Sequence, residues 1–319
     1  MWLCRAVRAV PRSNPTKKEK GKRTMEEGLK FRARPGDVLQ STYPKCGTKW
    51  VQFITQLILR EGEPIRDYDD YFRNIRSVEY TNDREWKATL PLRTYLTHLP
   101  LRPEMMDDGA KYVYVARNPW DVCVSFYDMV SDLSVYRFQD GTFEEFFEAF
   151  LAGDFGFGSY FEHVASAYAM RERPNVFFFT YEELKGNTRD TVLRLAQFLG
   201  ERYGKLFGDA SNGMLDTLLE RSSADQMRSV MVVRMEKDKT SGWYAQVKLN
   251  NVTSKRGYQG DGNKYTVVNK GRVGGWKEMF TADQLRRLEA KIVEEGEKAS
   301  FMTLWESMRA EAVELSKRT

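Results

Sequence analysis

Apolar positions along the chain follow two patterns, short dense runs and longer stretches with helical spacing. Dense runs rich in β-branched and aromatic residues predict strands at residues 36–43, 93–100, 110–117 and 175–181. Apolar residues three and four positions apart predict helices at residues 50–62 and 118–130, and a third helix that follows a polar break and ends at Gly200. Strands that alternate with helices predict a single α/β domain, in which helices flank a central parallel sheet.

The predicted boundaries coincide with residues that favour them. Asn118 is a suitable N-cap and Pro119 suits the first position of the helix that follows, while Pro100 ends a strand and Gly62 ends a helix. In open parallel sheets, ligands bind beyond the carboxyl ends of the strands. The turns "YPKCGTK", "RNPWD" and "TYEELK" all lie there, so we expect the functional site at this edge of the sheet.

Residues 236–266 are rich in Gly, Lys and Asn and have little apolar periodicity. This composition predicts a surface loop or a mobile lid, and the residues do not separate the two. No internal repeat or low-complexity linker divides the chain into two domains.

The net charge of +5 is concentrated at the N-terminus. Residues 1–23 hold eight Lys and Arg against one Glu, a net of +7, which leaves −2 for residues 24–319. We expect residues 1–25 to form a basic flexible arm and residues 26–319 the folded domain, with a mitochondrial presequence as the alternative for the arm. A domain without a basic stripe is not expected to bind nucleic acid, and no stretch of about 18 apolar residues predicts a membrane span.

The three cysteines, Cys4, Cys46 and Cys123, are far apart and odd in number. They fit neither a disulfide framework nor a zinc site, which needs paired Cys or His at close spacing. We therefore expect a reducing, cytoplasmic compartment and no metal ion.

The segment "YPKCGTKW" at residues 43–50 has the residue types of an anion-binding loop. A helix N-terminus offers unpaired N–H groups and partial positive charge. Gly47 permits close backbone approach, Thr48 adds a hydroxyl, and Lys45 and Lys49 add charge. The segment is not a Walker motif, because the residue after Lys49 is Trp50 and no Gly stands five positions before Gly47. By itself it is equally compatible with an ordinary turn.

Four further segments change this interpretation. "THLP" at 97–100, "YVARNPWDVCVSFY" at 114–127, "TYEELKGN" at 180–187 and "KGRVGGWKEMFT" at 270–281 follow the loop in order. Together the five segments resemble the cytosolic sulfotransferases, whose loop usually reads YPKSGTTW. The resemblance spans about 240 residues. It implies a strand–loop–helix that binds phosphate at the start of the sheet.

The resemblance implies transfer of a sulfuryl group from 3′-phosphoadenosine 5′-phosphosulfate (PAPS), with PAP as product, to a hydroxyl or amine. It gives His98, in the THLP position, the role of general base, and Lys45 that of stabilising the leaving phosphate. The alternatives are that His98 caps a carbonyl and that Lys45 is a solvated charge. His163 lies outside the motifs, and we expect a structural or helix-surface residue.

The same resemblance implies a set of PAPS contacts. The 5′-phosphosulfate is expected on Lys45, Cys46, Gly47, Thr48 and Lys49, and Cys46, where the family commonly has Ser, can supply only a backbone N–H. The 3′-phosphate is expected on Arg117, Ser125, Asn269, Lys270 and Gly271. The adenine is expected against Trp50, Tyr181 and Ser222, although each aromatic side chain could instead be core packing.

Several residues depart from the family pattern. Leu96 replaces a Lys before THLP, Lys49 replaces a Thr, Ala224 replaces an adenine-stacking Phe, Asn269 replaces an Arg and Gly275 replaces an Asp. Loss of the Arg removes a bidentate phosphate contact, whereas Lys49 adds charge. We expect PAPS to remain the donor, with an affinity that these changes can lower.

The motifs do not identify the acceptor, because variable loops form its pocket. We expect a small aromatic acceptor, such as a phenol, catecholamine or other alcohol or an aryl amine. Pro44, Phe126 and Met129 are expected to contact it. Further candidates for an aromatic slot, each equally compatible with the core, are Tyr68, Tyr71 and Phe72.

The family's dimer segment, KxxxTVxxxE, is only partly present. Lys277 and Thr281 match it, but Ala282 and Arg286 do not, so a homodimer remains possible without being predicted. Two alternative functions are compatible with some of the residues. A protein that holds PAPS or PAP without turnover is suggested by the departures, and a kinase is opposed by the missing Walker pair.

Overall fold

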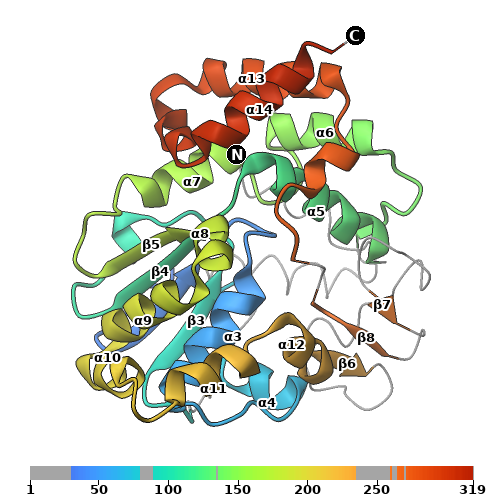
Figure 1. Ribbon diagram of the computed structural model, residues 1–319. Helices are drawn as coiled ribbons and strands as arrows, with labels where there is room; N and C mark the ends of the chain where they lie inside the picture. The colour runs from blue at the N-terminus through green and yellow to red at the C-terminus, as the bar shows by residue number, and fades with distance from the viewer. Residues whose placement is uncertain are drawn as a thin grey trace.

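The computed structural model describes residues 30–79, 89–133, 136–234, 259–260, 264–268 and 271–318. Five strands form a parallel sheet in the order β2–β3–β1–β4–β5, which confirms the predicted α/β fold (Figure 1). Their bounds are Asp37–Ser41 (β1), Arg76–Ser77 (β2), Arg93–Thr97 (β3), Lys111–Ala116 (β4) and Val176–Thr180 (β5).

The first strand, β1, lies at the centre of the sheet. It pairs with β3 on one side, where Ser41 is opposite Thr97, and with β4 on the other, where Ser41 is opposite Tyr114. The chain therefore adds strands on one side of β1 and then on the other. Such a reversal opens a crevice at the carboxyl ends of the strands, where ligands bind.

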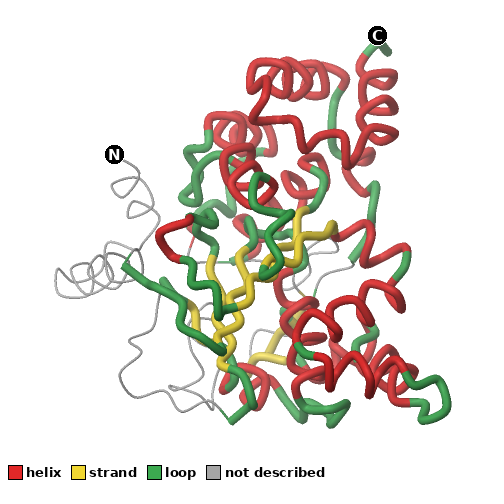
Figure 2. Tube along the Cα trace, turned by 90° about the vertical axis from the view of Figure 1, so that its left-hand side faces the viewer, coloured by secondary structure: helices red, strands yellow, loops and turns green. Residues whose placement is uncertain are grey.

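Helices cover both faces of the sheet. One group contains α3 (Thr48–Leu59), α9 (Thr188–Leu199), α10 (Glu201–Gly208) and α11 (Met214–Arg221), which contact one another. The other contains α5 (Pro119–Asp132), α6 (Phe143–Ala152), α7 (Tyr160–Tyr168), α13 (Ala282–Glu295) and α14 (Glu306–Ser316). Figure 2 shows the strands crossing the interior between these helices.

Shorter elements connect these layers. They are the helices α4 (Tyr68–Arg73), α8 (Tyr181–Gly186) and α12 (Ala224–Val230) and the 3₁₀ segments Pro103–Met105, Gly275–Glu278 and Gly296–Trp305. A second, antiparallel sheet has the order β6–β8–β7, with bounds Val232–Arg234 (β6), Gln259–Gly260 (β7) and Lys264–Thr266 (β8). Within the segment 236–266, expected to be a surface loop or a mobile lid, β7 and β8 form instead of irregular loop, and residues 236–258 and 261–263 lie outside the described residues.

The predicted boundaries of α5 are confirmed at atomic detail. The Asn118 side-chain oxygen accepts a hydrogen bond from the backbone N–H of Asp121 at 2.8 Å, and Pro119 is the first helical residue. The predicted polar break after β5 is wrong, because α8 forms there. Thr180 caps it by accepting a hydrogen bond from the N–H of Glu183 at 3.0 Å, a local signal that the sequence carried.

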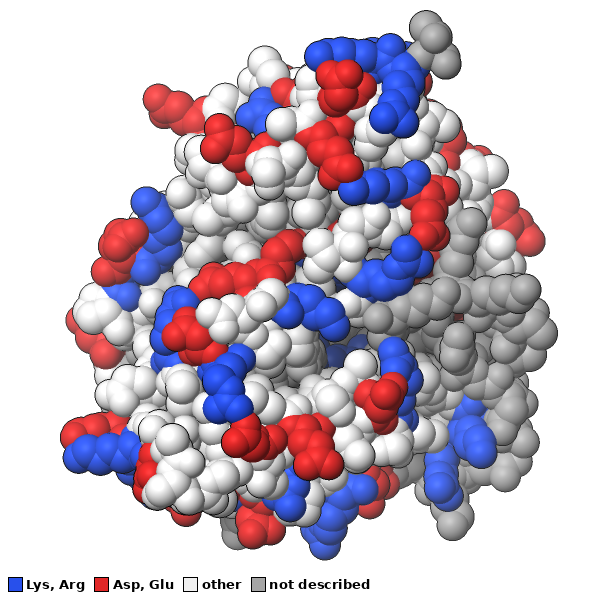
Figure 3. Space-filling view, viewed as in Figure 1, with Lys and Arg blue, Asp and Glu red and all other residues white. Residues whose placement is uncertain are grey.

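On the face shown in Figure 3, Lys and Arg side chains alternate with Asp and Glu, as the small net charge of residues 24–319 predicts. No helix among the described residues is long and apolar enough to cross a membrane. The predicted arm at residues 1–25 lies outside the described residues, as do Asn269 and Lys270.

Candidate active site

The loop between β1 and α3 is shaped by two residues with left-handed backbone. Lys45 has φ 72° and Gly47 has φ 98°. A β-carbon on Gly47 would lie 2.7 Å from Cδ2 of Tyr181, so glycine is required both by the backbone and by the close contact. The loop and α8 are thereby packed directly against each other.

The N-terminus of α3 is open toward the crevice. No side chain caps it, and its first turn contains no acidic residue. The Thr48 hydroxyl hydrogen-bonds the Thr42 hydroxyl at 2.7 Å, which fixes the first turn to the end of β1. A 12-residue helix with uncapped N–H groups provides partial positive charge at this point.

Arg117, at the end of β4, joins three segments. Its Nη1 donates to the carbonyl of Lys45 at 3.2 Å and its Nη2 to the carbonyl of Arg272 at 2.7 Å. The guanidinium carbon lies 4.6 Å from the ring centroid of Tyr181. The Nε atom is buried and has no hydrogen-bond partner among the described residues, which leaves one donor for an anionic ligand.

Trp50 and Tyr181 form an aromatic pair beside this guanidinium. Their ring centroids are 5.6 Å apart in an edge-on arrangement. The Trp50 indole N–H donates to the carbonyl of Ser222 at 3.0 Å, and the Lys185 ammonium lies 5.8 Å from the Trp50 ring. Lys185 was missed in the sequence, although it follows Tyr181 by four residues and so lies on the same helix face.

His98, directly after β3, is held in a defined tautomer. Its Nδ1 lies 2.8 Å from the carbonyl oxygen of Thr42, which can only accept. The proton of the neutral ring is therefore on Nδ1 and the lone pair is on Nε2. Phe157 packs edge-on against the imidazole, with centroids 5.7 Å apart.

The electrostatic surroundings keep His98 neutral. Burial lowers the pKa of His98, and the charges of Lys49 and Lys45 lower it further. Glu79 opposes this effect, because its carboxylate accepts the backbone N–H of His98 and favours the protonated ring. The pKa of His98 is lowered overall, so the ring is neutral at neutral pH and its lone pair is free to accept a proton.

The two loop lysines have lowered pKa values. Burial, followed by the charge of Lys49, lowers the pKa of Lys45 to about 7, although Asp128 acts in the opposite direction. Burial lowers the pKa of Lys49 to about 7. A phosphate or sulfate between these amines would favour their protonated forms.

A cavity of about 580 Å³ unites these groups. Figure 3 shows a hollow in the surface between α8 and α12. The predicted site residues that line the cavity are Pro44, Lys45, Gly47, Thr48, Lys49, Trp50, His98, Arg117, Ser125, Met129, Tyr181 and Gly271. The departures Leu96, Ala224 and Gly275 line it as well.

Three predicted residues are placed differently. Cys46 and Phe126 are fully buried, and neither is among the residues that line the cavity. The Cys46 N–H hydrogen-bonds the carbonyl of Tyr43 at 3.3 Å. Ser222 is buried outside the lining, and its hydroxyl donates to the carbonyl of Leu219 at 3.2 Å.

Much of the remaining cavity lining is aromatic and apolar. It contains the three candidate residues of α4 and several that sequence reasoning missed, namely Tyr136, Phe157, Met227 and Met279. Arg76, Ser77 and Asp128 add polar groups to this lining. Except for Met279, which lies in the segment at 270–281, these residues come from segments without a family motif, so no sequence signal identified them.

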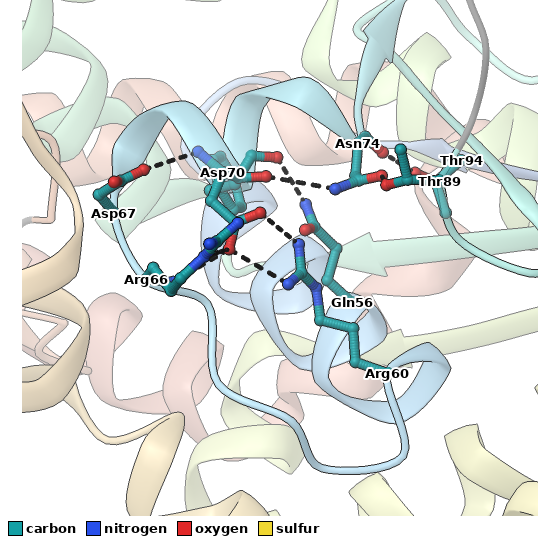
Figure 4. Close-up of polar contacts among 9 residues, drawn as sticks. Gln56, Arg60, Arg66, Asp67, Asp70, Asn74, Thr89 and Thr94 are labelled. Carbon is teal, nitrogen blue, oxygen red and sulfur yellow. Dashed lines mark hydrogen bonds and ion pairs between the residues drawn. The ribbon is translucent and has the colours of Figure 1, made fainter.

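Tyr68, Tyr71 and Phe72 of α4 form an aromatic wall of the cavity. A polar network fixes α4, and with it this wall, to α3, the helix that follows the loop at residues 43–50 (Figure 4). The Asp70 carboxylate accepts two hydrogen bonds from the Arg60 guanidinium, at 2.9 and 3.2 Å, and one from the Arg66 backbone N–H at 3.1 Å. The Gln56 amide donates to the carbonyl of Tyr71 at 2.9 Å. The aromatic wall on α4 and the loop at residues 43–50 are therefore both anchored to α3.

The model of the sulfotransferase domain family matches residues 35–300. The chain belongs to this family. The sulfotransferase is therefore an enzyme, as the resemblance implied. It is 33% identical to the 3-alpha-hydroxysteroid sulfotransferase of Cavia porcellus over 273 residues, which covers 83% of this chain and 85% of the relative.

Two solved structures share the fold of this sulfotransferase. Mouse sulfotransferase SULT7A1, complexed with PAP, superimposes with a TM-score of 0.63 at 22% identity and covers 90% of this chain and 93% of its own. Retinol dehydratase, in complex with androsterone and the inactive cofactor PAP, has a TM-score of 0.62 at 22% identity. The superposition covers 88% of this chain and 85% of retinol dehydratase.

The dimer-segment residues of this sulfotransferase take part in contacts within the chain. Lys277 pairs with Glu311 at 2.5 Å, and Thr281 caps α13. Arg286 pairs with Asp283 at 3.1 Å.

Proposed function

We propose that this sulfotransferase transfers the sulfuryl group of PAPS to a hydroxyl or amine of a small aromatic acceptor, with His98 as general base. The observation that carries the proposal is the position of His98. Its lone pair lies on Nε2, and the residue lines the same cavity as the anion-binding loop. A base and an anion site in one cavity fit transfer of an anionic group to a protonated nucleophile.

The residues present fit the two phosphate-bearing ends of PAPS. The uncapped N-terminus of α3, with Lys45 and Lys49, suits the 5′-phosphosulfate. Arg117, with a buried Nε available, and Ser125 suit the 3′-phosphate. Gly271 has φ 61°, and a β-carbon there would lie 3.1 Å from the Tyr181 hydroxyl, so the chain closes tightly over this end.

When bound, PAPS supplies the sulfuryl group for an in-line displacement. The Nε2 atom of His98 takes the proton of the acceptor hydroxyl or amine. Protonated Lys45 neutralises negative charge at the loop, which lowers the energy of charge developing there. The aromatic walls exclude water, and this strengthens both interactions.

The lining supports a small aromatic acceptor. Tyr68, Tyr71 and Phe72 form one wall, and Phe157 packs against His98. Flat apolar surfaces favour ring stacking and burial of a phenol or aryl amine. The name of the guinea-pig relative and the androsterone complex of retinol dehydratase make hydroxysteroids a necessary part of any acceptor panel.

The test is transfer of labelled sulfate from PAPS to a panel of phenols, catecholamines, hydroxysteroids, aliphatic alcohols and amines, with PAP binding measured in parallel. Transfer by the wild type that His98→Ala lowers by about 10² to 10⁴ supports the reaction and the base. Binding of PAP without any transfer would favour a ligand-holding protein. Failure to bind PAP would overturn the proposal.

A further inference from the structure

The second histidine of the chain lies directly behind the first. His163, on α7, has no exposed surface, and its Nε2 lies 3.1 Å from the carbonyl oxygen of His98. Its Nδ1 lies 2.7 Å from the hydroxyl of Tyr114, on β4. A buried histidine with a polar partner on each ring nitrogen connects α7, the sheet and the loop after β3.

The direction of both hydrogen bonds follows from the partners. A carbonyl oxygen only accepts, so Nε2 of His163 carries the proton and donates to His98. In the neutral ring Nδ1 is then an acceptor, and the Tyr114 hydroxyl donates to it. Burial lowers the pKa of His163 to about 3, so the ring stays neutral. The two histidines therefore hold opposite tautomers.

We propose that His163 is a positioning residue for catalysis, which fixes the main chain of His98 through its Nε2–H and so aims the His98 ring into the cavity. The inference rests on the proposed role of His98 as base. Tyr114 is the second member of the device, because its hydroxyl can donate to the unprotonated Nδ1 and so supports the His163 tautomer that the His98 carbonyl requires.

Other contacts also hold His98, including the edge-on packing of Phe157. Glu79 accepts its N–H, and Thr42 accepts from its ring at 2.8 Å. The N–H of the peptide between His98 and Leu99 donates to the Thr97 hydroxyl at 3.0 Å. Without His163 the carbonyl of the same peptide loses its donor, and the peptide can tilt about this remaining hydrogen bond. Because a general base must lie within hydrogen-bond reach of its proton, a displacement of about 1 Å can cost about 100-fold in rate.

Three substitutions at this position separate positioning from packing. His163→Gln places an amide N–H near the Nε2 position and keeps the donor to His98. His163→Asn places its amide near the Nδ1 position, toward Tyr114, and cannot reach the carbonyl. His163→Leu fills the space without hydrogen bonds. Tyr114→Phe removes the hydroxyl that can donate to Nδ1 and leaves His163 in place.

The kinetic readout is kcat per PAP-binding site, with KM for PAPS and acceptor. We expect His163→Gln to keep kcat within about threefold of wild type. We expect His163→Asn and His163→Leu to lower kcat about 10- to 100-fold, with the Kd for PAP unchanged within twofold. Tyr114→Phe should give a smaller loss. Equal kcat in His163→Gln and His163→Asn, or unchanged kcat in His163→Leu, would overturn the proposal.

The spectroscopic readout is the long-range ¹H–¹⁵N spectrum of histidine-labelled protein. The chain has only two histidines, so both tautomers are read directly. We expect an Nδ1–H form for His98 and an Nε2–H form for His163, and His163→Asn should broaden or shift the His98 signals while His163→Gln does not. The same tautomer for both rings contradicts the proposal.

His98→Ala is included to distinguish the two hypotheses. If His98→Ala retains wild-type kcat, the proposed base is wrong and this proposal falls with it. If His98→Ala loses turnover while every His163 variant keeps it, only the positioning role is wrong.

Discussion

The carbonyl oxygen of Thr42 lies 2.8 Å from Nδ1 of His98, and this contact joins the end of β1 to the end of β3. It sets the side of the imidazole that can act as a base. The loop at residues 43–50 begins at the next residue after Thr42, so the residue that orients the proposed base directly precedes the proposed anion-binding loop.

The first prediction concerns the base itself. His98→Gln keeps a polar side chain of similar reach but cannot accept a proton, so kcat should fall by about 10² to 10⁴. PAP affinity should stay within about twofold. Steady-state kinetics and calorimetry check the two parts. In the wild type, the lowered pKa of His98 places the acidic limb of kcat/KM below the ordinary range of histidine, and a limb above it would contradict the assignment.

The second prediction concerns the pH dependence of PAP binding. The amines of Lys45 and Lys49 have pKa values of about 7, so both lose charge as the pH rises above 7. A bound phosphate raises these pKa values, and binding must then take up protons. PAP affinity should fall by at least about tenfold from pH 7 to pH 9, where phosphate is already ionised. Calorimetry in buffers of different ionisation enthalpy measures the proton uptake. If PAP binding took up no protons at pH 8, the lowered pKa values of the two lysines would be refuted.

The third prediction concerns the coupling between the two lysines. The charge of Lys49 is the second cause, after burial, of the lowered pKa of Lys45. Lys49→Thr should therefore raise the pKa of Lys45 without restoring its ordinary value. NMR of ¹³C-dimethylated lysines, with Lys45→Arg to assign the signal, measures the change. An unchanged titration would show that burial acts alone.

The fourth prediction concerns Gly47. Gly47→Ala would place a β-carbon 2.7 Å from the Tyr181 ring and strain a φ of 98°, so PAP affinity should fall more than about tenfold as the ring moves. Gly213→Ala is the matched control. Its φ is 64° and no atom lies within 4 Å, so it carries the strain, about 1 kcal/mol, without the contact. Equal PAP affinities in the two variants would exclude a role for the contact.

The fifth prediction concerns Asp70, which supports the aromatic wall. Asp70→Asn removes the charge that binds Arg60 and should lower the free energy of unfolding by roughly 2 kcal/mol. The acceptor KM should rise because α4 moves, whereas PAP affinity should not change. Asp67→Asn is the control, because Asn caps a helix as well as Asp does. Acceptor and PAP titrations with denaturant unfolding measure these effects.

The stability difference at Asp70 also depends on pH. Burial alone would raise the pKa of Asp70, but hydrogen bonds from Arg60 and Arg66 lower it overall. A carboxyl group with a lowered folded pKa stabilises the fold above its unfolded pKa and loses that effect as the pH falls through the folded value. The difference between wild type and Asp70→Asn should therefore shrink in acid, and a constant difference would contradict the charge-based explanation.

Local signals made much of the fold and site predictable. Asn118 and Pro119 fix the start of α5 within four residues of sequence, and the dense apolar runs of β1, β3 and β4 fix the strands. The motif at Thr97–Pro100 identified His98 as a candidate, and His98 lines the same cavity as the loop at residues 43–50. The short helix α8 was missed because its cap and length resemble a turn.

What the sequence alone predicted was the kind of fold, the sulfotransferase motifs and the residues proposed for the reaction, since each motif is a short run of neighbouring residues. Tertiary structure alone decided the tautomers of His98 and His163, the lowered pKa values of Lys45 and Lys49 and the aromatic wall on α4. Those properties arise from burial and from hydrogen bonds between segments up to 65 residues apart, and no local pattern encodes them.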